Sequence, residues 1–339
     1  MESTIFGIDM KKMNSFRKLI KIFRSRAVKW LFFIFFLWLL FRQLQSYGDL
    51  DEMFTEFKGH LGASSFWLLI VALLLTWINY HLEAEKWKVL TKPFQVISLK
   101  TALMAVYAGN SLGLISPARL GEYGGRMLGL KPENRAKSVW ALSFGAFLQK
   151  VVIYWLGFFS LIYGFKQVML NYGANTYLPP SYFVPILVIV GLLFTGALIF
   201  YDPIIRVILR KQSWVGKKVY QGYFKYNWQA TWASLGLTLG RYLVYSIQLY
   251  LLNRFFGLPN DPIVQFSIIF VTYWIQSFFP LPSALGLLIK SEIALFLWAS
   301  YGVNEISVLS GTFFLWIING VLPALIGLLF LDRLLVNKT

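Results

Sequence analysis

Seven charged side chains of this sequence lie inside or beside strongly apolar stretches. A charge at the middle of a membrane helix costs roughly 2.5–3.5 kcal/mol, so such residues must pair, reach water or meet a charged ligand. Five of the seven are cations and two are anions, which leaves three positive charges without a partner. The surplus predicts a site for an anion. The residues are Arg119, Glu122, Arg126, Lys150, Arg241, Lys290 and Glu292.

The anion that best fits such a site is a phosphate carried by a lipid, because the site is surrounded by apolar sequence. Arginine suits phosphate, since its planar guanidinium can bind two oxygens at once. We therefore expect these residues to bind the anionic headgroup of a membrane lipid.

The first cluster of candidate residues covers 116–126. Pro117 is typical of the first turn of a helix, which predicts a helix that starts there. Glu122 and Arg126 are four residues apart and are expected to pair on one face, while Arg119 and the start of the helix face the ligand. The alternative is an ion-pair network that only orients the segment. The small residues expected to act as hinges are Gly121, Gly124 and Gly125.

The second cluster follows a break in another apolar segment. Pro280 and Pro282 interrupt the helix, and Gly286 permits close approach of the backbone. Lys290 is expected to face phosphate and Glu292 to hold a cation or a proton. The alternative is that Lys290 extends to the membrane surface.

Two further cations lie within apolar spans. Lys150 and Arg241 are expected to face the interior of the helix bundle and to help shield the phosphate. In this interpretation Glu122 and Glu292 keep the cations oriented. The alternative is that backbone carbonyls or these two glutamates satisfy both charges.

The elements that position these residues are predicted to be membrane helices. Of the 339 residues, 57% are hydrophobic and 14% are charged, against about 25% charged in soluble domains. We expect an all-α polytopic membrane protein with about six full spans and two re-entrant or broken hairpins, about eight membrane segments in all. The spans are near 30–46, 64–82, 138–165, 182–201, 231–253 and 306–331, and the interrupted regions are 99–130 and 263–300.

The distribution of lysine and arginine predicts the topology. Basic residues in 1–29, in the presumed loop 83–98 and after 332 place these segments in the cytoplasm, the two termini included. The order of two spans, a hairpin and a third span then occurs twice, in opposite orientation, over about 30–165 and 182–331. This pattern favours an inverted repeat of the kind found in transporters. The expected organisation is a basic segment 1–29, one transmembrane domain 30–332 and a tail 333–339.

Several other functions are excluded or disfavoured. The chain has no cysteine and only two histidines, so we expect no disulfide, no metal site and no cofactor. No ATP-binding or hydrolase motif occurs, so we expect no enzyme. The formal net charge of +17 is assigned to cytoplasmic loops and not to nucleic-acid binding.

The first cluster resembles a motif of the lysylphosphatidylglycerol synthase transmembrane region and its stand-alone flippase-like relatives. The motif, P-x-R-x-G-E-x-x-x-R, is met by Pro117, Arg119, Gly121, Glu122 and Arg126.

A second motif of this family is a Pro-x-Pro-Gly-Gly-x-Gly turn followed by a glutamate. Here Ser283 and Ala284 replace two of its glycines. The residues that correspond are Pro280, Pro282, Gly286 and Glu292.

The resemblance covers roughly 30–331 and implies a protein that moves lipids between leaflets. It does not imply aminoacyl transfer, which resides in a separate soluble domain of the synthases.

The sequence thus predicts a flippase for an anionic lipid in the cell inner membrane. The alternatives are a membrane transferase for a lipid-linked substrate, a non-catalytic partner of a lipid-modifying enzyme, and a transporter of small solutes. Anionic membrane lipids are the expected partners, and a homodimer or a complex with a lipid-modifying enzyme stays open.

Overall fold

The computed structural model of the chain describes residues 50–61, 65–116, 119–171, 183–199, 225–279, 283–299 and 301–336. The chain divides into two compact units, 1–50 and 51–339, and the fold below is that of the second. Several predicted features lie outside the described residues. They are the basic segment 1–29, the span 30–46, Pro117, Pro280, Pro282 and residues 337–339.

Every regular element in these described ranges is helical. The helices are α3 (Leu50–Leu61), α4 (Phe66–Thr91), α5 (Leu99–Ile115), α6 (Gly121–Met127), η2 (Pro132–Asn134), α7 (Arg135–Asn171), α8 (Phe183–Ile199), α11 (Trp228–Phe255), α12 (Pro262–Gln276), α13 (Ser283–Ala299), α14 (Glu305–Trp316), η3 (Ile317–Val321) and α15 (Leu322–Val336). The predicted all-α class is therefore confirmed.

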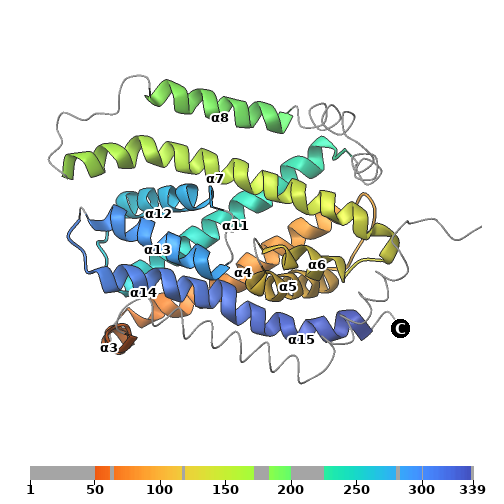
Figure 1. Cartoon of the computed structure of the whole chain (residues 1–339), viewed down its shortest axis with the longest axis horizontal. Helices are drawn as coiled ribbons and strands as arrows, with labels where there is room; N and C mark the ends of the chain where they lie inside the picture. Colours follow the sequence, from red (N-terminus) through yellow and green to blue (C-terminus); the bar gives the residue numbers. More distant parts are fainter. Residues whose placement is uncertain are drawn as a thin grey trace, which may run out of the picture. The chain divides into compact units, whose positions relative to one another are not determined.

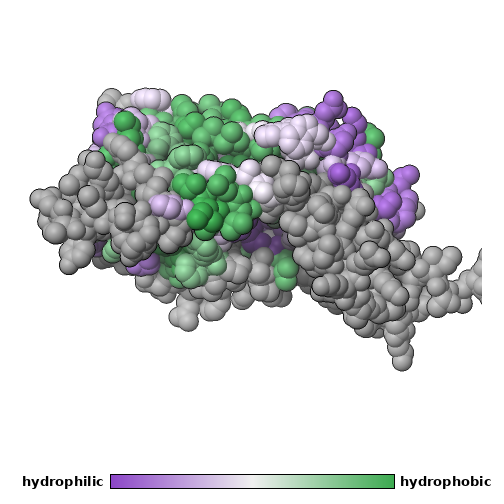
Figure 2. All heavy atoms as spheres, turned by 90° about the horizontal axis from the view of Figure 1, so that it is seen from above, coloured by the Kyte–Doolittle hydropathy of each residue, from purple (hydrophilic) through white to green (hydrophobic). Residues whose placement is uncertain are grey.

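Within the described ranges, three stretches of helix are long and apolar enough to cross a membrane: Phe66–Thr91, Pro132–Leu161 and Glu305–Leu331. Large apolar side chains on the outside, such as Trp77 at 72% exposure and Leu193 at 67%, suit contact with lipid. Figure 2 shows hydrophobic residues gathered along the middle of one face and hydrophilic ones toward its ends. The total of about eight membrane segments stays a prediction.

The helix α4 is longer than the sequence indicated. The predicted span ended at residue 82 and was followed by a cytoplasmic loop, but the helix continues to Thr91, just before Pro93. Glu83, Lys86 and Trp87 are therefore buried residues of a helix and not residues of a loop. The assignment of a loop at 83–98 is wrong over 83–91, because the charges that mark a loop in sequence face the interior here.

The first interrupted region forms a tight pair of helices. A side chain added at Gly125 of α6 would place its Cβ 2.5 Å from the backbone of Gly109 in α5. At Gly121 it would lie 2.1 Å from the carbonyl of Leu112. Only glycine permits this separation of the two helices, which brings the charged residues of α6 beside α4.

Each hairpin of the unit packs on a helix of the other half. In Figure 1, α4 and α11 run side by side through the middle, α5 lies on α15, and α12 lies on α7. The first hairpin thus packs on the last helix of the second half, and the second hairpin on the last helix of the first half. The inverted repeat itself remains a prediction from sequence.

The α-helical hydrogen bonding of the last membrane helix is broken at one turn, although the helix itself is continuous. Between α14 and α15, residues Ile317–Val321 form the π-helical turn η3. Pro323 has no N–H to donate to the carbonyl of Asn319 four residues earlier, and the Tyr80 hydroxyl donates to that carbonyl at 2.7 Å. The carbonyl of Gly320 accepts from the side chain of Asn110 at 2.9 Å. Helices α4 and α5 therefore support the break.

Candidate anion-binding site

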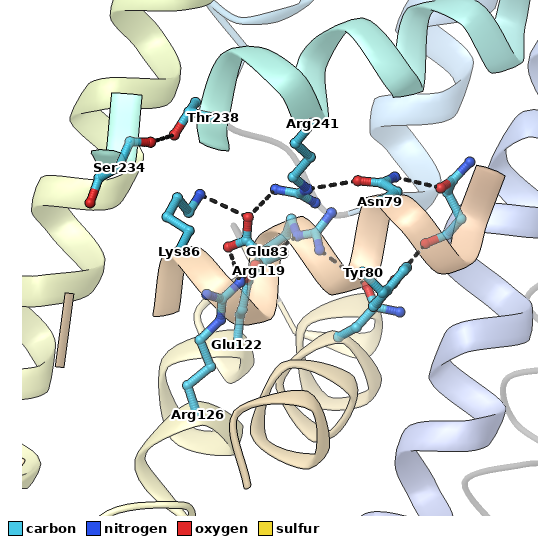
Figure 3. A network of polar contacts seen from close by, with 12 residues as sticks. Asn79, Tyr80, Glu83, Lys86, Arg119, Glu122, Arg126, Ser234, Thr238 and Arg241 are labelled. Carbon is cyan, nitrogen blue, oxygen red and sulfur yellow. Dashed lines mark hydrogen bonds and ion pairs between the residues drawn. The ribbon is translucent and has the colours of Figure 1, made fainter. Parts of the chain in front are cut away.

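Glu83 is the centre of a buried network of charges. Its carboxylate receives Arg126 Nη2 at 2.7 Å, Lys86 Nζ at 2.8 Å and Arg241 Nη1 at 2.8 Å. Figure 3 shows it between Arg241 of α11 and Arg126 of α6. Glu83 is only 3% exposed, so three neighbouring cations are needed to offset the cost of burying its charge.

Arg126 joins this centre to a second carboxylate. It pairs with both Glu83 and Glu122, and its guanidinium lies 5.7 Å from the centre of the Trp87 ring. The pair between Glu122 and Arg126 is the one predicted from their spacing of four residues. Arg126 is 4% exposed and is held on two sides, so its role is to link the two carboxylates.

Arg119 does not lie on the helix that was predicted to begin at Pro117. Helix α6 begins at Gly121, and Arg119 precedes it with φ of +58°, in the left-handed region that costs a residue with a side chain about 1 kcal/mol or more. A tight turn and not an α-helical one precedes α6, where Gly121 approaches α5 closely. Arg119 Nε lies 3.3 Å from Glu122 Oε2, and Nη2 donates to Asn110 Oδ1 at 3.2 Å.

Arg241 is held in the same way. Its Nη1 pairs with Glu83, and its Nε donates to Asn79 Oδ1 at 2.9 Å. The side chains of Arg241 and Arg119 are 29% and 45% exposed. Each arginine thus has one carboxylate and one asparagine behind it, which use two of its five N–H groups. The remaining N–H groups are available to an anion.

The network carries a surplus of positive charge. Four cations face two carboxylates, so two positive charges are not neutralised within it. The more exposed cations are Arg119 and Arg241, while Lys86 and Arg126 are buried. The surplus can therefore be presented to a ligand through the two exposed arginines.

Two of the predicted site residues, Lys150 and Lys290, make their described contacts outside the Glu83 network. Lys150 donates to the backbone carbonyl of Ser277. Lys290 donates to the Tyr245 hydroxyl at 3.0 Å and lies 5.0 and 5.2 Å from the rings of Tyr245 and Tyr273. The expectation that Lys150 joins the arginines is not met in the described contacts, because Lys150 reaches the backbone after α12 instead.

The remaining predicted residues, Glu292, Gly124 and Gly286, lie in the two hairpins. Glu292 is exposed and forms no ion pair among the described residues, so Glu83 does the orienting that was expected of Glu292. A Cβ added at Gly124 would have no neighbour within 4 Å beyond its own helix backbone, unlike one added at Gly125. The carbonyl of Gly286 accepts from Gln276 Nε2 at 2.8 Å, which ties α13 to α12.

The sequence interpretation missed Glu83, Lys86, Asn79 and Asn110. Glu83, Lys86, Trp87 and Leu90 recur at the spacing of one helix face, and this was the signal that α4 continues inward. For the asparagines no comparable signal existed. No group of three or more potential metal ligands occurs in the ranges that the structure describes.

The family of the chain follows from comparison of its sequence. The model of the lysylphosphatidylglycerol synthase transmembrane region matches residues 27–327. The chain belongs to this family. A search of curated protein sequences finds no significant match. Membership confirms the resemblance drawn from the motifs and relates the chain to membrane proteins of lipid modification or translocation.

Proposed function

We propose that the protein is a translocase that moves a phosphate-bearing anionic lipid between the leaflets of the cell membrane. The observation that carries the proposal is the surplus of two positive charges in a network built from membrane helices. Family membership supports a role with lipids.

In this proposal the lipid phosphate binds between Arg119 and Arg241. Both guanidiniums are fixed from behind by a carboxylate and an amide oxygen, so little side-chain freedom is lost when the headgroup binds. The acyl chains stay in the surrounding lipid. The headgroup is thereby protected from the hydrocarbon, which is the main barrier to its crossing.

Glu83 and Glu122 would limit the affinity for the phosphate. Each carboxylate already draws on the charge of the arginine that faces the ligand. A translocase has to release its substrate, and partly neutralised arginines bind phosphate less tightly than free ones would. The network in this view balances capture against release.

The proposal is tested with purified protein in vesicles that contain a fluorescent phosphatidylglycerol. Bleaching of the outer leaflet with a reductant measures exchange between leaflets. We expect faster exchange than in empty vesicles, and a loss of about tenfold or more in Arg119→Gln, because charge-assisted hydrogen bonds are worth roughly 1.5–3 kcal/mol.

Lys88→Gln is the matched control. Lys88 pairs with Glu85 at 2.9 Å at a partly exposed position outside the network, so exchange should be unchanged. Exchange in Arg119→Gln at the wild-type rate would contradict the proposal. Chemical conversion of the labelled lipid during the assay would instead favour the transferase alternative.

A further inference from the structure

The two asparagines that accept hydrogen bonds from the arginines also both donate to the π-helical turn η3. Asn79 accepts from Arg241 and donates through Nδ2 to Asn319 Oδ1 at 2.7 Å. Asn110 accepts from Arg119 and donates through Nδ2 to the carbonyl of Gly320 at 2.9 Å. Both paths therefore end on adjacent residues of η3, although the arginines come from different segments of the chain.

The path from Arg241 continues as a directed chain of amides. Arg241 donates to Asn79, Asn79 to Asn319, and Asn319 Nδ2 donates to Gln248 Oε1 at 3.1 Å. Gln248 Nε2 then donates to the carbonyl of Ala72 at 2.8 Å. Each amide accepts from the previous group and donates to the next, so its orientation is fixed by the cation at the start.

The element at which the paths meet is a break in a helix. A π-helical turn carries one extra residue relative to the α-helix, and such turns occur frequently at functional sites. The break has its own support, because the Tyr80 hydroxyl donates to the carbonyl of Asn319. Beyond it, α15 is fixed on α5, since a Cβ at Gly327 would lie 2.0 Å from the carbonyl of Tyr107. A change in η3 therefore alters the direction of α14 relative to the α5–α15 pair.

We propose that η3 couples the two arginines to the bend between α14 and α15. A phosphate that binds Arg119 and Arg241 pulls on both guanidiniums, which stay bound to Asn110 and Asn79. The pull passes through Asn110 and Asn79 to Gly320 and Asn319, and the bend changes with occupancy of the site. Asn79, Asn110 and Asn319 are thus positioning residues. This inference rests on the proposed function, since it supplies the conformational step that a translocase needs.

The test measures the distance between spin labels at the two ends of the bent helix. The chain contains no cysteine, so Glu305→Cys and Arg333→Cys introduce the only two attachment sites, at exposed positions about 42 Å apart along a straight helix. The protein is placed in nanodiscs of phosphatidylcholine alone or with phosphatidylglycerol. We expect the distance distribution to shift when phosphatidylglycerol is present.

The shift should be clearly reduced in two variants, one that cuts the path from Asn79 and one that removes a support of η3 itself. Asn319→Leu removes the amide between Asn79 and Gln248, and Tyr80→Phe removes the hydroxyl that supports the break. The matched controls are Ser310→Ala, whose buried hydroxyl has no described partner, and Tyr107→Phe, whose ring stacks on that of Tyr80 at 4.5 Å. Both controls should shift as the wild type does.

Two results would overturn the inference. One is a wild-type distance that does not change with phosphatidylglycerol, and the other is a full shift in Tyr80→Phe, which is the variant expected to fold normally. Retention of phosphatidylglycerol is measured on the same samples by native mass spectrometry. Retained lipid without a shift contradicts only the coupling, whereas failure to retain lipid contradicts the proposed function.

Discussion

The two interrupted regions of the chain differ in the groups that contact their cations. Around α5 and α6, Lys86 and Arg126 meet carboxylates in a network that reaches from α4 to α11. Around α12 and α13, Lys150 and Lys290 meet a backbone carbonyl, a tyrosine hydroxyl and aromatic rings. No ion pair joins a lysine to a carboxylate in the described part of this second region.

The difference shows that a charge inside the bundle is not by itself a sign of a ligand site. Lys290 is 6% exposed, and cation–π contacts with two rings offset part of the cost of its burial. The first region instead joins six charged groups and leaves two exposed arginines fixed in place. The comparison therefore favours the first hairpin as the place of the proposed ligand, and the following substitutions test it.

The largest effect is expected for Glu83→Gln. The substitution leaves Lys86, Arg126 and Arg241 around a neutral group, and uncompensated buried charge typically costs about 3–5 kcal/mol. We expect a strongly lowered thermal unfolding temperature in detergent, measured by tryptophan fluorescence. Glu292→Gln in the second region is the control, because Glu292 is exposed, and it should unfold as the wild type does. Equal stability of the two variants would contradict the central role of Glu83.

An intermediate effect is expected for Gly125→Ala. The added methyl group meets the backbone of Gly109 at 2.5 Å, and overpacking of this kind costs about 1–3 kcal/mol. The neighbouring Gly124→Ala has open space and should be neutral or slightly stabilising. In the second hairpin, Gly286→Ala meets Gln276 at an ordinary 3.5 Å and should cost less than Gly125→Ala. Thermal unfolding of all three variants tests this ranking.

The smallest effect is expected for Lys290→Met, with Lys86→Met as its counterpart. Both lysines are almost fully buried, but among the described residues only Lys86 has a carboxylate partner. Replacing Lys290 by an apolar side chain of similar length should change the free energy of unfolding by about 1 kcal/mol or less, whereas Lys86→Met should cost about 1–3 kcal/mol. Denaturant titration measures both values, and a larger cost at Lys290 would mean that it has an anionic partner.

Much of the fold followed from the sequence, but the end of α4 did not. Hydropathy locates a span by its apolar residues, and Glu83, Lys86 and Lys88 lower that signal within two turns. The burial of Glu83 depends on cations of α6 and α11 that lie far along the chain. A prediction from local composition cannot include these partners, so it assigned the charges to a loop.

The site was predicted only in part, because local pairs can be read from the sequence and distant partners cannot. The spacing of Glu122 and Arg126 is local, and their pair is present as expected. The positions of Arg119 and Arg241 depend on Asn110 and Asn79, which have no charge and no motif that marks them. The π-helical break was also missed, although Asn319, Gly320 and Pro323 stand close together in the sequence.

The central claim is that Arg119 and Arg241 bind an anionic headgroup. It is tested most directly by native mass spectrometry of the protein from vesicles with equal phosphatidylglycerol and phosphatidylcholine. Arg254→Gln is the matched control for Arg241→Gln, since Arg254 lies on the same helix and donates only to the neutral Tyr250 hydroxyl among its described contacts. We predict that the wild type and Arg254→Gln retain phosphatidylglycerol selectively and that Arg241→Gln and Arg119→Gln do not. Selective retention that persists in both of these variants would contradict the claim.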